Sequence, residues 1–385
     1  MREQNSQFRI IAVLLIVLIS LSVGLFFIPI TPTAVVDANT ERNHNRYRQA
    51  EMSSDLVTEF TQTLVGDGQE NVIDVFYRGD IYIFGNTTSS DYDFTRSGSF
   101  VAVVTPKGET KAFYEYGDTL KKVINIGADF VLGMQSDIPY LMAISDSGEI
   151  RRKQAVPSSE GENIEDLIVL TDGYGVVTSK VGDIGNTRLK LTTFDETLQY
   201  RSSISAKENY SLGYVDTLII ADKPYLLANA FGMSKNMRAF GVWGHALTTY
   251  PLDFSYTVKD FWIRNGEFVY LAETDRGSAV IDGDDITALN GKPKKIIAED
   301  DIYASTTYGL YKNGSLSDPF DISYYSDYVC CVKSEKGKTS VKLIGKKEFA
   351  FSFSASYNSP SIFACSAGVF VIDYAYKVSI TKLSV

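Results

Sequence analysis

The chain has 385 residues, of which 44% are hydrophobic and 22% are charged, so it can bury a large core and is neither disordered nor collagen-like. Its formal net charge of −10 argues against nucleic acid as a partner, because phosphate binding requires clustered lysine and arginine. The 24 tyrosines, 22 phenylalanines and 29 glycines, with few helical periods between them, favour β structure.

The first apolar segment predicts a membrane anchor. Residues 10–28 read IIAVLLIVLISLSVGLFFI without a charge, and a helix of this length spans about 28 Å, close to the ~30 Å hydrocarbon core of a bilayer. We assign residues 10–30 to a transmembrane helix and residues 1–9 to the cytoplasm, because Arg2 and Arg9 precede the helix. The rest of the chain is then extracytoplasmic, as in a single-pass protein of the cell membrane.

A cleaved signal peptide is the alternative, with cleavage near Thr33, Ala34 or Ala38, although the apolar regions of signal peptides run only ~7–15 residues. Both interpretations export the rest of the chain. Residues 31–54 are polar, and we expect a juxtamembrane spacer that holds the following domain, residues 55–385, away from the bilayer.

An internal repeat organises that domain. Each copy has a short apolar run, a turn and a second apolar run, as in DVFYRGDIYIFG. The copies begin at Asp74, Asp129, Asp166, Asp216, Asp260, Asp301, Asp327 and Ser361. Their spacing centres on about 40 residues, the length of four short antiparallel strands with their turns. Because so small a sheet cannot bury both of its faces alone, the copies must stack radially and close a ring.

The two ends of the repeat region predict how this ring closes. The last copy has room for only three strands, at about residues 362–365, 369–374 and 377–383. A strand from residues 55–65 would supply the missing fourth and would remove an open sheet edge. The same residues also fit a short helix, so the sequence leaves both possibilities open.

On these copies, residues from about 55 to 385 resemble the β-propeller superfamily. The resemblance implies an all-β fold with eight blades, or seven as the alternative, behind the N-terminal transmembrane helix. It does not extend to one family. The sequence lacks the Trp-Asp dipeptides of WD40 blades, the Trp-ended repeats of quinoproteins and the Asp boxes of sialidases.

The seven repeat aspartates are the most suggestive polar set. A ring of carboxylates at one mouth of a propeller could hold a cation or a basic partner. Alternatively, each aspartate caps the turn that leads into its strand, and radial repetition would reproduce such a residue in every blade. We favour the structural role. The run from Asp282 to Asp285 likewise fits a turn better than a calcium loop, and we predict no metal site, no cofactor and no catalytic residue.

The two tryptophans receive different interpretations. Trp243 lies in a glycine-flanked run and is the candidate binding residue, since tryptophan is favoured at protein interfaces. Trp262 continues an apolar strand and is expected in the core. Among the cysteines, Cys330 or Cys331 could pair with Cys365 across neighbouring blades, but three buried thiols are the preferred interpretation.

The fold alone suggests a non-catalytic protein-interaction or scaffold module of the cell envelope, with a protein partner of unknown identity. A sensor that binds a small ligand or a carbohydrate is the first alternative. A propeller hydrolase or a quinoprotein-type enzyme is the second, and the sequence leaves an enzymatic activity open without offering a signature for one.

Overall fold

The computed structural model describes most of the C-terminal part of the chain. The described residues are 41–42, 57–126, 128–157, 159–182, 186–206, 211–220, 223–231, 235–240, 246–251, 256–318, 321–325, 328–335, 337–344, 348–353, 360–365, 367–374 and 377–384. The chain divides into two compact units, Met1–Ala34 and Val35–Val385. The predicted transmembrane segment lies outside the described residues, and no helix within them is both long and apolar enough to cross a membrane.

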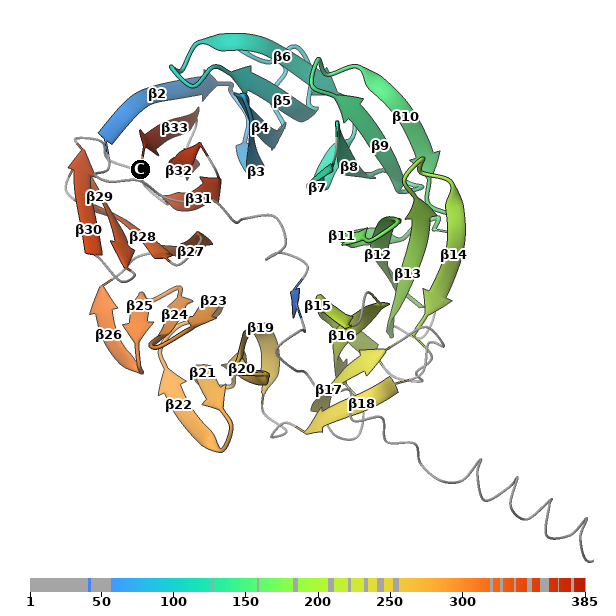
Figure 1. Ribbon diagram of the computed structural model, residues 1–385, viewed down its shortest axis with the longest axis vertical. Coiled ribbons are helices and arrows are strands. Elements are labelled where there is room, and N and C mark those ends of the chain that lie inside the picture. Colours follow the sequence, from blue (N-terminus) through green and yellow to red (C-terminus); the bar gives the residue numbers. More distant parts are fainter. Residues whose placement is uncertain are drawn as a thin grey trace, which may run out of the picture. The chain divides into compact units, whose positions relative to one another are not determined.

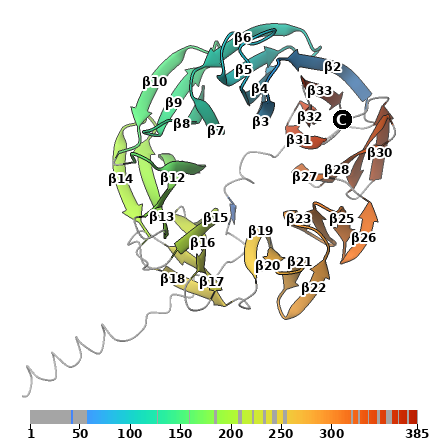
Figure 2. The same cartoon turned by 180° about the vertical axis from the view of Figure 1, so that it is seen from behind.

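The second unit is built from antiparallel sheets that follow one another around a ring in chain order (Figure 1, Figure 2). The described residues form eight such sheets, numbered here from 1 to 8. Sheets 1 to 3 contain β3 (Glu70–Arg78), β4 (Asp80–Thr87), β5 (Gly98–Val104) and β6 (Thr110–Tyr116); β7 (Thr119–Ile126), β8 (Asp129–Gln135), β9 (Tyr140–Ser145) and β10 (Ile150–Ala155); and β11 (Asn163–Leu170), β12 (Gly173–Val181), β13 (Thr187–Asp195) and β14 (Tyr200–Ser205).

The remaining sheets repeat the same arrangement, with the first strand named below for each sheet nearest the centre of the ring. Sheets 4 to 6 contain β15 (Ser211–Ile220), β16 (Lys223–Phe231), β17 (Lys235–Phe240) and β18 (Ala246–Pro251); β19 (Thr257–Arg264), β20 (Glu267–Thr274), β21 (Gly277–Asp282) and β22 (Asp285–Leu289); and β23 (Pro293–Ala298), β24 (Ile302–Thr306), β25 (Leu310–Lys312) and β26 (Ser315–Asp318). Sheets 7 and 8 contain β27 (Asp321–Tyr325), β28 (Tyr328–Glu335), β29 (Lys338–Ile344) and β30 (Glu348–Phe353); and β31 (Ser361–Cys365), β32 (Gly368–Tyr374), β33 (Lys377–Ser384) and β2 (Val57–Val65).

Burial changes from strand to strand across a sheet. In sheet 2 every residue of β9, with the sequence YLMAIS, is buried, whereas β10, with the sequence IRRKQA, is exposed along almost its whole length. Middle strands are covered on both faces by the neighbouring sheets and therefore read as continuous apolar runs. The outermost strands border solvent, where charged side chains are tolerated.

Side chains between neighbouring sheets form the core. Between sheets 1 and 2, Phe84 and Phe130 are fully buried with ring centroids 5.0 Å apart, and the ring of Tyr82 lies 4.8 Å from that of Phe130. Burial of one such side chain contributes roughly 1.5–3 kcal/mol to folding. The core is therefore a series of layers between sheets, and each sheet depends on both of its neighbours.

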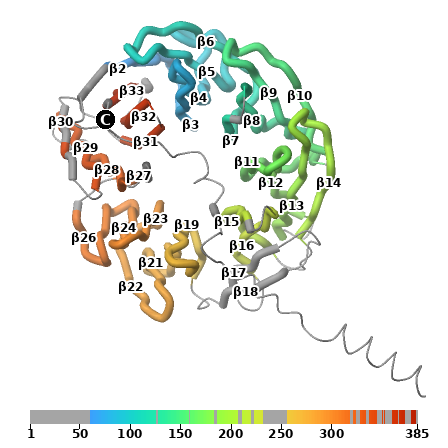
Figure 3. The backbone as a smooth tube through the Cα atoms, viewed as in Figure 1, coloured from blue at the N-terminus to red at the C-terminus, as the bar shows by residue number. Residues whose placement is uncertain are grey.

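The ring closes through its two ends. Strand β2 pairs antiparallel with β33, from Val57 opposite Ser384 to Val65 opposite Lys377, as the fourth strand of sheet 8. The N-terminal strand thus completes the sheet formed by the C-terminal strands (Figure 3). The predicted closing strand is confirmed, and the alternative of a short helix at these residues is not observed.

A short strand inside the predicted spacer belongs to the second unit. Strand β1 (Glu41–Arg42) pairs with the innermost strand of sheet 4, with Glu41 opposite Ile219 and Arg42 opposite Leu218. The compact unit also begins at Val35. Glu41 and Arg42 lie within the spacer predicted for residues 31–54, whose bounds stay a prediction.

Tight turns join consecutive strands of a sheet. Asn265 and Gly266, between β19 and β20, both adopt positive φ angles, 53° and 79°, as a type I′ hairpin turn requires. The predicted turn between Asp282 and Asp285 joins β21 to β22, with Gly283 at a φ of 59°.

Candidate functional site

The innermost strands of the ring share an irregularity. In the part of the chain that the structure describes, the innermost strands of sheets 1 to 6 each contain a β-bulge, and the residue after each bulge is charged. These residues are Asp74, Lys122, Asp166, Asp216, Asp260 and Lys295. Because a bulge breaks the regular alternation of a strand, it can redirect charged side chains toward the centre of the ring.

Two of the predicted repeat aspartates occupy a different position. Asp129 begins β8, the second strand of sheet 2, where its Oδ1 lies 2.7 Å from Nη1 of Arg151. Asp301 directly precedes β24, the second strand of sheet 6, where its Oδ2 lies 2.7 Å from Nζ of Lys312. The expected equivalence does not hold for these two residues, and Asp327 lies outside the described residues.

Lys122 and Lys295 occupy the bulge position in these two sheets, and the sequence analysis missed both. In sheets 1 to 5 the charged residue lies four positions before the end of the innermost strand, and in sheet 6 it lies three positions before it. Counting back from the hairpin turn would have found both lysines. The repeat position was assigned instead to Asp129 and Asp301, which follow the two lysines by seven and six residues.

The bulge aspartates hold their own strands in place. The carboxylates of Asp74, Asp166 and Asp216 each accept a hydrogen bond from the amide of the following residue, at 2.7–2.9 Å. Asp260 accepts a hydrogen bond of 2.8 Å from the amide of Ile296 in sheet 6. A bulge leaves a backbone amide without its ladder partner, so each carboxylate satisfies a donor that burial would otherwise penalise.

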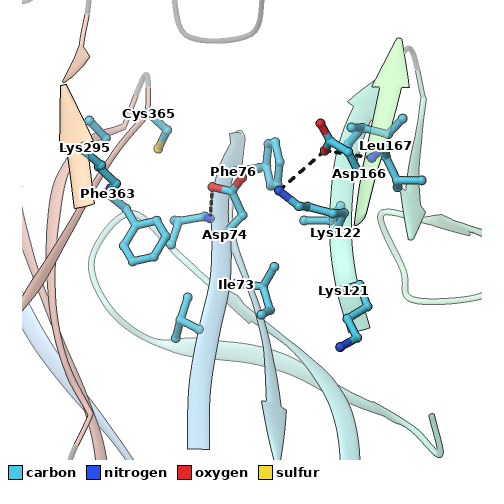
Figure 4. A pocket seen from close by; sticks show the side chains of 15 residues that line it. Ile73, Asp74, Phe76, Lys121, Lys122, Asp166, Leu167, Lys295, Phe363 and Cys365 are labelled. Atoms are coloured by element: carbon cyan, nitrogen blue, oxygen red, sulfur yellow. Dashed lines mark hydrogen bonds and ion pairs between the residues drawn. The ribbon is translucent and has the colours of Figure 1, made fainter. Parts of the chain in front are cut away.

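A cavity of about 400 Å³ lies against these innermost strands. It is lined by β3, β7, β11 and β31 of sheets 1, 2, 3 and 8, and by one residue of β23 in sheet 6 (Figure 4). The charged residues of its lining are Asp74, Lys121, Lys122, Asp166 and Lys295. Its apolar wall includes Ile73, Phe76 and Phe363, and Cys365 lies beside them.

Asp166 contacts two neighbouring sheets through its carboxylate. It is buried, and its Oδ1 lies 3.5 Å from Nζ of Lys122 in the neighbouring sheet. Its Oδ2 accepts a hydrogen bond of 2.8 Å from the hydroxyl of Tyr214 in sheet 4. Burial raises the pKa of Tyr214, and the carboxylates of Asp166 and Asp216 raise it further, so this hydroxyl remains a proton donor.

The three cysteines are thiols, and two of the three are buried, as the preferred interpretation expected. Cys330 and Cys331 are buried on opposite faces of β28, one against sheet 8 and the other against sheet 6. Cys365 is half-buried at the end of β31 and lines the cavity. Within the described residues, no group of three or more His, Cys, Asp or Glu side chains is arranged to hold a metal ion.

Of the two tryptophans, the structure describes only Trp262. Trp262 on β19 is 6% exposed and packs with residues of sheets 5 to 7, as predicted for a core residue. Trp243, the candidate binding residue, lies outside the described residues, so its role stays a prediction.

Comparisons with known proteins identify the fold. No family model matches the chain, and no curated protein matches it in sequence. The structure is similar to BamB from Moraxella catarrhalis, with a TM-score of 0.53 and 12% identity over 86% of this chain and 98% of that chain. It is also similar to Sqt1 of Saccharomyces cerevisiae, with a TM-score of 0.54 and 11% identity over 87% and 100% of the two chains. At this identity the likeness carries the fold alone, and the predicted β-propeller is confirmed.

Proposed function

We propose that this β-propeller is the extracytoplasmic part of a single-pass membrane protein, and that it binds a protein partner of the cell envelope without catalysing a reaction. The charge-free residues 10–28, preceded by Arg2 and Arg9, support the anchor and its orientation. Eight sheets among the described residues, with β2 completing sheet 8, support a ring of eight blades.

Exposed apolar side chains on one face of the ring carry this proposal. Because neighbouring strands are antiparallel, the loop between the second and third strands of a sheet lies on the same face as the connection to the next sheet. We call this face the connection face. Among the described residues, the most exposed large apolar side chains in or next to its loops are Tyr92 at 73%, Val181 at 64%, Tyr308 at 59% and Ile138 at 48%. Exposed aromatic residues of this kind anchor protein interfaces.

The loop that presents Tyr92 is held in a defined shape. The carboxylate of Asp93 accepts a hydrogen bond of 2.7 Å from the amide of Val65, and that of Asp91 accepts one of 3.0 Å from the amide of Asp67. The first amide belongs to the last residue of β2, and the second lies in the connection between sheets 8 and 1. A contact residue on an ordered loop loses less entropy on binding, which favours a docking role over a merely tolerated surface aromatic.

Substitution of the connection face tests the partner. We expect Tyr92→Ser with Tyr308→Ser to leave the thermal midpoint within about 2 °C of the parent and to reduce co-purification of cross-linked partners from membranes at least about fivefold. Tyr200→Ser is the matched control, because Tyr200 is 49% exposed at the hairpin end of β14, on the opposite face. Equal recovery of every partner with both variants would contradict docking on the connection face.

Protease accessibility tests the orientation. A tag at the C-terminus should be digested when protease is added outside intact cells or spheroplasts, because the propeller is exported. A tag that is protected in intact cells and cut only after lysis would contradict the proposal. A mature N-terminus near Ala34 or Ala38 would keep export and remove the anchor.

A further inference from the structure

The cavity at the innermost strands receives two consecutive lysines from one strand. In a regular strand, neighbouring side chains point to opposite faces, so Lys121 and Lys122 could not both reach one site. The bulge between Leu120 and Lys122 breaks that alternation, and both lysines line the cavity. Figure 4 shows them on the wall formed by β7, with Lys295 on the far side of the cavity.

Positive charge exceeds negative charge in the lining. Lys122 faces Asp166, whose two carboxylate oxygens also accept hydrogen bonds from the Leu167 amide and the Tyr214 hydroxyl. Lys295 donates to the backbone carbonyl of Ile322 at 3.3 Å, a neutral acceptor that does not cancel its charge.

Neither Lys121 nor Lys295 forms an ion pair within the part of the chain that the structure describes. With three lysines and two aspartates lining it, the cavity is locally cationic, although the whole chain carries a net charge of −10. This local reversal of sign favours a negatively charged occupant.

The rest of the lining favours a ligand with an apolar part. The rings of Phe76 and Phe363 both border the cavity, and both side chains are half-buried, so part of their surface faces the open space. The volume of about 400 Å³ falls within the ~300–1,000 Å³ range of small-molecule sites. An occupant of this size has room for one ring or a short chain beside its charged group.

We propose that this cavity is a binding site for a small amphiphilic anion, with a carboxylate or phosphate group on an apolar body. The ammonium groups of Lys121 and Lys295 attract the anionic group, and Lys122 is held by Asp166 as part of the wall. Phe76 and Phe363 cover the apolar body. The site lies on the innermost strands, whereas the proposed protein partner docks on loops of the connection face.

Matched probes separate charge from shape. The full chain in lipid nanodiscs is titrated with 3-phenylpropionate, with its neutral amide 3-phenylpropanamide, and with phenyl phosphate, and binding is read from the relaxation of the ligand protons. Empty nanodiscs supply the blank. We expect the carboxylate to bind at least about fivefold more tightly than the amide, because the two differ mainly in charge. Stronger binding of phenyl phosphate would also support the proposal and would identify phosphate as the preferred group.

Three variants test which lysines bind the anionic group. Lys121→Gln and Lys295→Gln should each weaken 3-phenylpropionate about fivefold and leave the amide unchanged, as expected for loss of one partly solvated charge interaction. Lys107→Gln, at the hairpin between β5 and β6, is the matched control and should leave both affinities unchanged. Lys121 is exposed, so its variant should fold even where Lys295→Gln loses stability.

Three outcomes would overturn the proposal. One is equal affinity of the parent chain for the carboxylate and the amide. The second is unchanged carboxylate affinity in both Lys121→Gln and Lys295→Gln. The third is equal weakening by Lys107→Gln, because a long-range effect of net charge would then explain the preference.

Discussion

Asp166 joins three sheets at a single side chain. Its carboxylate accepts hydrogen bonds from the amide of Leu167 in its own strand and from the hydroxyl of Tyr214 in sheet 4, and it faces Lys122 of sheet 2. Asp166 is buried and Tyr214 is half-buried, so water can replace the hydrogen bond between them only at a cost in free energy.

Removal of this carboxylate should therefore destabilise the ring. We expect Asp166→Ala to lower the free energy of unfolding by about 2 kcal/mol, since it removes the acceptor of a bulge amide and leaves the Tyr214 hydroxyl with only the Thr217 hydroxyl, 2.8 Å away, as a partner. Asp172→Ala is the matched control in the same sheet, because Asp172 forms an exposed ion pair with Arg201 and should contribute below about 1 kcal/mol. Urea unfolding measures both, and equal losses would show that Asp166 acts only as a surface charge.

Strand β2 stabilises the ring as a whole element, because it completes a sheet that the C-terminal strands leave open. It pairs with β33 along its whole length, and the hydroxyls of Thr61 and Thr381 lie 2.9 Å apart across the two strands. Leu64 buries its side chain in the layer between sheets 8 and 1. Without β2, the edge of β33 would be exposed and open to pairing with another chain.

Shortened chains test this closure. A chain that begins at Glu51 should be a soluble monomer, whereas one that begins at Asn71 should aggregate or melt at least about 5 °C lower. A synthetic peptide of residues 57–65, added in excess, should restore the midpoint of the shorter chain by pairing with the open edge. Identical solubility and midpoints of the two chains would show that closure does not depend on β2.

The same elements show what the sequence could and could not predict. The closing strand was predictable because the last repeat visibly lacks a fourth strand and an apolar run precedes the first repeat. The bulge lysines were not recognised, because Asp129 and Asp301 follow them at the next turn and resemble the true repeat residue. The cavity itself depends on how strands of five sheets meet, and no spacing along the chain encodes that distance.

At the scale of the whole ring, tyrosines with raised pKa values make the free energy of unfolding fall at alkaline pH. Burial raises the pKa of several tyrosines above the ordinary value near 10, with Tyr82 at about 12. The others are Tyr116, Tyr140, Tyr174, Tyr214 and Tyr303. The unfolded chain releases these protons at a lower pH than the folded chain does. The stability that the neutral hydroxyls contribute is therefore complete below about pH 10 and is lost as the pH rises toward 12.

The urea midpoint should consequently fall between pH 10 and pH 11, at constant ionic strength, while it stays nearly level from pH 8 to pH 9.5. Tyr82→Phe removes one linked proton and should make this fall shallower, at the cost of the hydrogen bond that the Tyr82 hydroxyl donates to the carbonyl of Asp146. Tyr92→Phe is the control, because the Tyr92 side chain is 73% exposed and its substitution should leave the slope unchanged. Lysine deprotonation acts alike in both variants, so the difference in slope isolates the buried tyrosine. Equal slopes for the two variants would mean that Tyr82 ionises in the folded ring as it does in the unfolded chain.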